Sequence, residues 1–549
     1  MRFALGLAVA MAGGWAGSAL AGTHVLTFGG GPPSHNQISL ERNVEYFRRV
    51  LDGVGLGSVR HDVYFGDGGA RPSVQYRLPD GDEQRLARAL GMILLNNPDG
   101  DIRYDKVHLP GLVGPSTVAN VQAWFDVVGR SLRPGDHLLF YFTGHGGPDS
   151  AHRDDPRDTN MVMPGRPDAL TVKQLAAQLD KLDPGVDATL VMVQCYSGGF
   201  ANLIYNDGDP ARGFSPHPRA GFFATIASRT SAGCSPDVSQ DDYHEFSTSF
   251  FEAILGETRS GRPVEKPDYD GDGRTSLDEA FTHVLLTSDT IDIPTATSDR
   301  LLRDKSRFGN GRRDDVRGML PKDAPWSTVL EHASPAQRAA LEGLARELDL
   351  HGEDRLAKAR ERAAELDPDR ERGRGPGRGR DRRPDSTAFE DVRDREPTAQ
   401  GPPGGPNLQG RGPGFGTGRL RAALAERWPE LTVPFHPDAP RIIAEQGDEI
   451  LRTLQAQPDF QAFSRRLSRR APDPEALARS PERRWVKHRR LLEQADSVIL
   501  GANLSRLDDP EALGVYRRLL EMERRVLGGD PTPPPVAGGR TAGVAPAGS

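Results

Sequence analysis

The sequence predicts an α/β protein with a mostly parallel central sheet, followed by a helical C-terminal region. Over residues 23–300, short apolar runs that fit buried strands alternate with amphipathic stretches that fit helices. Strands that are apolar throughout, without polar alternation, are typical of parallel sheets covered on both faces. Beyond residue 310 the chain becomes rich in Ala, Leu, Glu and Arg at helical spacing.

Each expected element has its own sequence signal. The strands are apolar runs closed by glycine-rich segments, and a helix stops where Pro134-Gly135 interrupts it. Ser39 is a suitable N-cap for the first helix. Strands are expected at residues 25–28, 61–65, 137–144, 189–194 and 222–228, and helices at about 39–51, 118–132, 171–182, 246–255 and 281–286.

The first 21 residues predict a secretory signal peptide. Met1-Arg2 is followed by an apolar stretch and then by the small-residue site Ala19-Leu20-Ala21. A non-cleaved anchor is the alternative. No later run approaches the ~18 apolar residues of a spanning helix. We therefore expect an exported protein, secreted or periplasmic, with no transmembrane segment.

Composition divides the rest of the chain. With 62 Gly and 45 Pro among 549 residues, a sizeable part is expected to be linker or disordered. The expected parts are a folded domain at 22–310, a helical segment at 311–366, a disordered Pro/Gly/Arg linker at 367–418, a helical domain at 419–527 and a disordered tail at 528–549. The C-terminal helices are a candidate surface for a protein partner.

The charge pattern argues against nucleic-acid binding. The net charge is −7, and the Arg/Gly tract at 372–380 lies among acidic residues, with no aromatic side chains to stack on bases.

The residues that carry chemistry are His145 and Cys195, fifty positions apart. Each follows an apolar run, and each is followed by paired glycines, directly at Gly146-Gly147 and starting three residues later at Gly198-Gly199. Chemistry in open α/β sheets collects at the carboxyl ends of strands. A base and a thiol at that edge predict a cysteine nucleophile with its histidine, and small residues let backbone N–H groups approach an oxyanion.

The chain has only two cysteines, Cys195 and Cys234. In an oxidising compartment, a disulfide between them would leave Cys195 without the free thiol that a nucleophile needs. We favour two free thiols, because proteins stapled by disulfides usually carry more cysteines. A cysteine-dependent α/β-hydrolase fits poorly, since its Gly-x-Cys-x-Gly elbow would need glycine at Val193 and Ser197.

The segments at 141–147 and 194–199 resemble the histidine and cysteine blocks of clan CD cysteine peptidases, most closely the legumain family and the related catalytic subunit of GPI transamidase, with caspases more distant. The resemblance covers about residues 23–300. It implies a caspase-like α/β/α sandwich, His145 as general base and acid, Cys195 as nucleophile, and the N–H groups of Gly146 and Cys195 as the oxyanion hole.

The resemblance also indicates a substrate pocket. His35 and Asn36 stand in the segment where legumains carry Arg-His-Gln, and Ser228 matches a pocket-wall serine. Val193 stands where legumains have an acidic residue, so their selectivity for asparagine does not carry over.

Residues 268–279 fit a twelve-residue EF-hand calcium loop, with glycine at the sixth position for the sharp turn. Lys266-Pro267 blocks a normal entering helix, so we expect a lone structural Ca²⁺ loop; an ordinary acidic turn is the alternative. The expected ligands are the side chains of Asp268, Asp270, Asp272 and Glu279, the carbonyl of Arg274, and a water held by Ser276.

Together these features predict an exported cysteine endopeptidase acting on peptide or protein substrates, with hydrolysis or ligation of the acyl-enzyme both open. A catalytically inert binding module that kept the fold and the calcium loop is the alternative.

Overall fold

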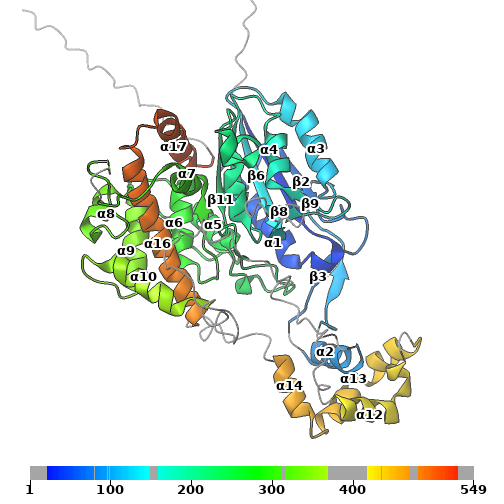
Figure 1. Cartoon of the computed structure of the whole chain (residues 1–549). Helices are drawn as coiled ribbons and strands as arrows, with labels where there is room; N and C mark the ends of the chain where they lie inside the picture. Colours follow the sequence, from blue (N-terminus) through cyan, green and yellow to red (C-terminus); the bar gives the residue numbers. More distant parts are fainter. Residues whose placement is uncertain are drawn as a thin grey trace, which may run out of the picture.

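The computed structural model describes residues 22–79, 81–95, 97, 99–148, 159–311, 316–368, 417–433, 436–468 and 480–528. The expected signal peptide and nearly all of the expected linker and tail lie outside these residues. The main body holds a seven-stranded sheet in the order β12-β11-β10-β6-β1-β2-β5 (Figure 1). Neighbouring strands are parallel except for the pair β11–β12. The predicted α/β class with a mostly parallel sheet is confirmed.

The strands of this sheet are β1 (Thr23–Gly30), β2 (His61–Phe65), β5 (Leu112–Gly114), β6 (His137–Gly144), β10 (Asp187–Met192), β11 (Arg219–Phe223) and β12 (Thr295–Ala296). The central strand β6 is buried along its whole length. Its side chains alternate between two cores, with Phe140 and Phe142 on one face and Leu139 and Tyr141 on the other.

Helices cover both faces of the sheet. One core contains residues of α3 (Val118–Val127) and α4 (Val172–Leu179). The other contains residues of α1 (Ile38–Gly53), α5 (Phe246–Leu255) and α6 (Leu277–Thr287). This two-sided cover explains why the middle of β6, from Leu138 to Phe142, is apolar throughout.

Further helices lie toward the C-terminus, as predicted. A shared core joins α8 (Trp326–His332), α9 (Pro335–Glu347), α10 (Arg355–Leu366) and the long α16 (Pro481–Leu504). The last helix, α17 (Pro510–Glu523), packs with α7 (Thr297–Lys305) beside β11. None of the described helices has the length and apolar character to cross a bilayer.

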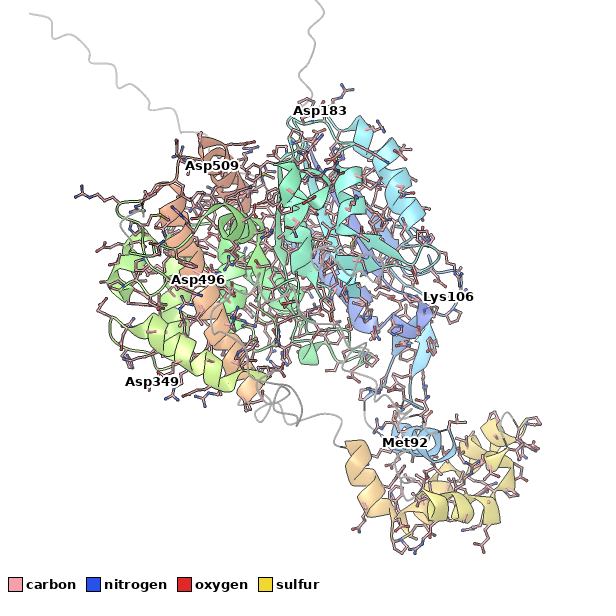
Figure 2. The ribbon with its side chains drawn as sticks, in the orientation of Figure 1. Met92, Lys106, Asp183, Asp349, Asp496 and Asp509 are labelled. Atoms are coloured by element: carbon pink, nitrogen blue, oxygen red, sulfur yellow. The ribbon has the colours of Figure 1, made fainter. Side chains whose placement is uncertain are left out.

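The range 419–527, expected to form one helical domain, is instead divided between a separate helical bundle and the main body. Its first helices, α12 (Gly418–Arg427), α13 (Ala439–Gln455) and α14 (Phe460–Ser468), pack with α2 (Asp82–Leu95). These four helices, called the α2 bundle below, lie apart from the main body (Figure 1). Figure 2 places Met92 in the α2 bundle and Asp496, on α16, in the main body.

Two smaller sheets lie beside the main one. The hairpin of β3 (Val74–Tyr76) and β4 (Arg103–Asp105) flanks α2 in sequence and therefore carries the α2 bundle. A three-stranded sheet of β7 (Gly146–Pro148), β8 (Thr159–Val162) and β9 (Ala169–Thr171) begins directly after His145.

Candidate active site

His145 and Cys195 follow neighbouring strands of the main sheet. His145 comes directly after β6, and Cys195 comes three residues after β10 ends at Met192. The two strands are parallel, with Met192 opposite Phe142, so both residues lie at the carboxyl edge of the sheet. The sequence prediction that two strands deliver them to one edge agrees with this register.

Gly146 brings the backbone after His145 against the backbone of Cys195. A Cβ atom at Gly146 would lie 2.3 Å from the Cys195 carbonyl oxygen and 2.5 Å from Gln194 Cγ. No side chain fits there, because real Cβ contacts essentially never fall below about 3 Å. Glycine at this position is therefore a requirement of the close approach.

The ring of His145 is held by Gln37. His145 Nε2 lies 2.9 Å from Gln37 Oε1, and the ring of His35 meets it edge-on at 5.6 Å between centroids. Burial, and to a lesser degree the neighbouring His35, lowers the pKa of His145 to about 4. The imidazole is therefore neutral at pH 7, the state that a general base needs.

The thiol of Cys195 is held by Ser231. Ser231 donates its backbone N–H to Cys195 Sγ at 3.3 Å, and its hydroxyl lies 3.8 Å from the same sulfur. The hydroxyl donates to the Val193 carbonyl at 3.0 Å. Burial raises the pKa of the Cys195 thiol, against the lowering effect of the Ser231 hydrogen bonds. Cys195 is therefore a thiol at neutral pH until a base removes its proton.

Cys234 is the second thiol of this site. Its Sγ lies 3.9 Å from His145 Nδ1, and both cysteines of the chain are free. Cys234 adopts a left-handed backbone with φ of 63°, which is uncommon for a residue with a side chain. Burial raises the pKa of this thiol well above its usual value. The loop at 231–234 thus contacts the sulfur of Cys195 at one end and the ring of His145 at the other.

A buried arginine of α16 supports the loop at 231–234 through Asp292. Arg490 is 1% exposed and donates to the carbonyl oxygens of Asp292 at 2.8 Å and Ser288 at 2.5 Å. The fully buried Asp292 in turn accepts the backbone N–H of Ala232 at 2.7 Å. Helix α16 therefore supports the segment that contacts both Cys195 and His145.

The predicted pocket residues are placed unequally. His35 is exposed and contacts the His145 ring, whereas Asn36 is fully buried beside Gly30 and Gly66, and its side-chain amide has no hydrogen-bond partner among the described residues. Ser228 is exposed in a turn, and the serine that contacts Cys195 is Ser231.

Sequence reasoning missed Gln37, Ser231 and Cys234 as members of the site. Gln37 directly follows Asn36, and Ser231 and Cys234 lie in the small-residue segment after β11. Nothing in the sequence indicated their roles beyond their position close to predicted site residues. The direction of a side chain in a loop leaves no periodic pattern in the sequence.

The acidic loop at 268–279 brings three of its expected ligands together. Asp268, Asp270 and Glu279 each offer an oxygen, and these atoms all lie within 4.8 Å of one another. Asp272 instead pairs with the Arg274 guanidinium at 3.2 Å. Ser276 caps α6 in a reciprocal pair with Glu279. The donors are carboxylates, so these three residues form a group that could hold a hard cation such as Ca²⁺.

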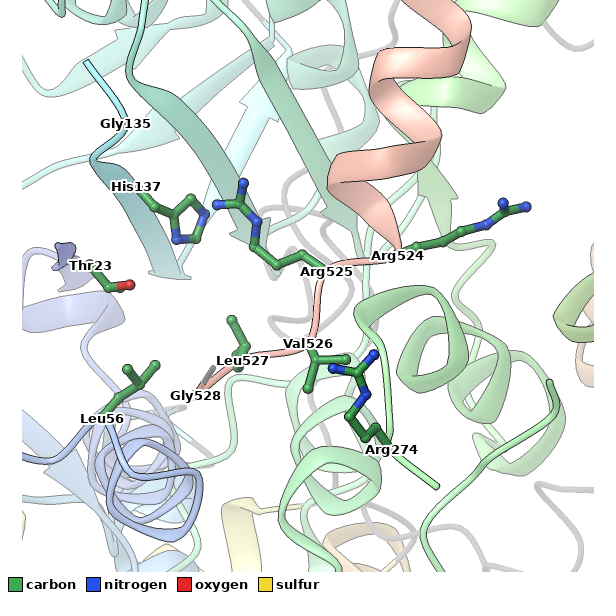
Figure 3. Close-up of a pocket in the computed structure, with 10 residues that line it drawn as sticks. All are labelled: Thr23, Leu56, Gly135, His137, Arg274, Arg524, Arg525, Val526, Leu527 and Gly528. Atoms are coloured by element: carbon green, nitrogen blue, oxygen red, sulfur yellow. The ribbon is translucent and has the colours of Figure 1, made fainter. Parts of the chain in front are cut away.

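This loop lies at the opposite edge of the sheet from His145. Arg274 lines a pocket together with Thr23 and His137, which begin β1 and β6, and with residues 524–528 (Figure 3). Leu277 donates its N–H to the Arg525 carbonyl at 3.0 Å. An ion in the loop would therefore stabilise the fold at a distance from the candidate dyad.

Comparisons with known proteins add little. No protein-family model matches the chain, and no curated protein matches it. Among solved structures, the chain is similar to the crystal structure of protein GSU0716 from Geobacter sulfurreducens, at 12% identity and a TM-score of 0.28 over 50% of this chain and 92% of that one. A likeness this weak carries no argument about fold or function.

Proposed function

We propose that this protein is an exported cysteine endopeptidase with a caspase- and legumain-like fold. The observation that carries the proposal is the fit of Gly146 against the backbone of Cys195, at the end of two adjacent parallel strands. This contact places the peptide after the candidate base next to the candidate nucleophile. The parallel sheet with one antiparallel edge strand and helices on both faces agrees with such a fold.

In the proposed reaction, His145 Nδ1 takes the proton of Cys195 Sγ, and the thiolate attacks the carbonyl carbon of a peptide. The N–H groups of Gly146 and Cys195 hold the oxyanion. His145 then gives its proton to the leaving amine as the C–N bond breaks. Water, or an amine in a ligation, attacks the thioester and restores the Cys195 thiol.

The contacts of Cys195 and His145 in the resting protein show which interactions substrate binding must change. Cys195 Sγ faces Ser231, and His145 Nδ1 faces Cys234. Catalytic contacts in free enzymes are often long and tighten only when substrate binds. In this proposal, substrate binding moves the loop at 231–234 so that Nδ1 exchanges the Cys234 thiol for the Cys195 thiol.

We also propose Ca²⁺ as a structural ion of the loop at 268–279, held by Asp268, Asp270 and Glu279. Bound there, it would stiffen the turn that leads into α6. The C-terminal helices remain the proposed surface for a protein partner.

The direct test is hydrolysis of a fluorogenic peptide library by the full chain with calcium present. Wild type should cleave, whereas Cys195→Ala and His145→Ala should each lose at least about 100-fold in rate, the lower range for a lost general base. Equal rates for wild type and both variants would instead support the inert binding module.

A further inference from the structure

Gln37 is itself held by a second glutamine from the β3–β4 hairpin. Gln37 Nε2 donates to Gln75 Oε1 at 3.3 Å, and Gln75 Nε2 donates to the Tyr104 hydroxyl at 3.1 Å. The backbones pair as well, because Gln75 donates its N–H to the Asn36 carbonyl at 2.7 Å. A continuous chain of polar contacts thus runs from Tyr104 through Gln75 and Gln37 to His145.

With the two amides oriented as the structure has them, this chain favours one nitrogen of His145 as the carrier of the proton. Gln75 Oε1 can only accept, so it requires the NH₂ group of Gln37 on its side. The oxygen of Gln37 then faces His145 Nε2, which must be the protonated nitrogen of the neutral ring. Nδ1 keeps its lone pair, and Nδ1 is the nitrogen that points to a thiol, that of Cys234.

Ion pairs of Arg77 hold the β3–β4 hairpin at its base. Arg77, just after β3, lies 2.9 Å from Asp101 and 3.4 Å from Asp237. Its backbone N–H also donates to the Pro236 carbonyl at 2.7 Å. Because Asp101 is almost fully buried, this anchor holds Gln75 beside Gln37 and joins the hairpin to the segment that follows Cys234.

We propose that Gln75 is a positioning residue of the active site, which acts through Gln37 to keep the proton of His145 on Nε2 and its lone pair on Nδ1. The proposal rests on the peptidase function for its catalytic meaning. The tautomer itself is a property of the resting protein. The hairpin that supplies Gln75 also carries the α2 bundle, so the bundle is coupled in structure to the base.

The primary test is nuclear magnetic resonance of the full chain with ¹⁵N-labelled histidine, with the His145 signals identified by their loss in His145→Ala. Wild type should show the Nε2–H tautomer. Gln75→Leu frees Gln37 to rotate, so a substantial Nδ1–H population is expected. Gln75→Glu keeps an acceptor for Gln37 and should restore the wild-type tautomer. Gln122→Leu, an exposed position on α3, is the matched control and should change nothing.

The kinetic test measures kcat/KM with the best peptide substrate. Gln75→Leu should lose roughly 10- to 100-fold, by analogy with groups that orient metal-binding histidines, and Gln75→Glu should recover most of the loss. Where Gln75→Leu fails to fold, Gln37→Leu takes its place with the same expectation.

Each outcome separates the two claims. An unchanged Nε2–H tautomer in Gln75→Leu overturns the positioning role, whatever the activity. If wild type cleaves no peptide while Gln75→Leu still changes the tautomer of His145, the peptidase proposal is overturned. The positioning role of Gln75 is then kept.

Discussion

His145 Nδ1 faces the sulfur of Cys234, 3.9 Å away, although Cys195 follows the neighbouring strand of the sheet. The candidate base therefore meets, in the resting protein, a thiol other than the candidate nucleophile. Both thiols have pKa values raised by burial, so neither ionises by itself at neutral pH. In the proposed mechanism, the thiol that gives its proton to His145 is the one that reacts.

Gly146 should not tolerate a side chain, whereas Gly147 should. A Cβ at Gly147 would find its nearest neighbour 3.7 Å away, at Asn160 Oδ1, an ordinary contact. We expect the Cβ of Gly146→Ala to displace the backbone that holds the oxyanion N–H and to cost at least about 100-fold in kcat/KM, the scale of a lost oxyanion donor. Gly147→Ala should stay near wild type. Circular dichroism checks that both variants fold. Equal activity of the two variants would contradict the requirement for glycine at position 146.

The acid limit of activity should reflect the lowered pKa of His145. The rate needs neutral imidazole, and burial with the nearby His35 brings this pKa to about 4. We expect kcat/KM to rise through about pH 4 and to be nearly complete by about pH 5 to 6. His35→Ala removes the smaller contribution and should move this limit to higher pH. An acid limit near 6.5 in wild type would contradict the buried, neutral histidine.

Glu523 on α17 should make the fold less stable at alkaline pH. Burial raises the pKa of its carboxyl to about 8, although Ser298 and Thr297 donate hydrogen bonds to it. The folded state therefore prefers the protonated form, and its contribution to stability declines as pH rises from the unfolded pKa toward 8. Glu523→Gln mimics the protonated group, so its melting temperature should exceed that of wild type at pH 8 by several degrees and match it near pH 4. A pH-independent difference would contradict this account.

Calcium should stabilise the wild-type protein through the loop at 268–279. A ligand at 100 times its Kd adds about 2.7 kcal/mol to the unfolding free energy. We expect millimolar Ca²⁺ to raise the melting temperature of wild type by a few degrees and that of Asp270→Asn much less. Asp448→Asn, an exposed change on α13, should respond like wild type. An equal response of Asp270→Asn would show that the ion binds elsewhere.

The sequence predicted the parts of this protein that periodicity governs. Buried strands such as β6 have apolar side chains on both faces, so apolar runs indicated the parallel sheet and the edge that bears His145 and Cys195. Contacts between distant loops left no such trace. Gln75 reaches Gln37 through a hairpin, and Ser231 reaches Cys195 through a turn, and only the folded chain brings these pairs together.

The contacts of the helices in 419–527 could not be predicted from the sequence either. Amphipathic spacing indicated helices in 419–527, but spacing alone does not say which partner each apolar face meets. Leu424 of α12 packs in the core that contains Leu90 of α2, from the first hundred residues, whereas Leu491 of α16 joins the core of α8 to α10. The loop at 268–279 was visible because its ligand spacing is local, yet Asp272 turned toward Arg274.

The most direct test of the central claim is to identify the cysteine that forms a covalent bond with a peptide carrying an electrophilic ketone. The account predicts that mass spectrometry finds the adduct on Cys195 in wild type and in Cys234→Ala, that Cys195→Ala forms none, and that His145→Ala reacts far more slowly. An adduct on Cys234 that persists in Cys195→Ala would contradict the assignment of Cys195 as the nucleophile.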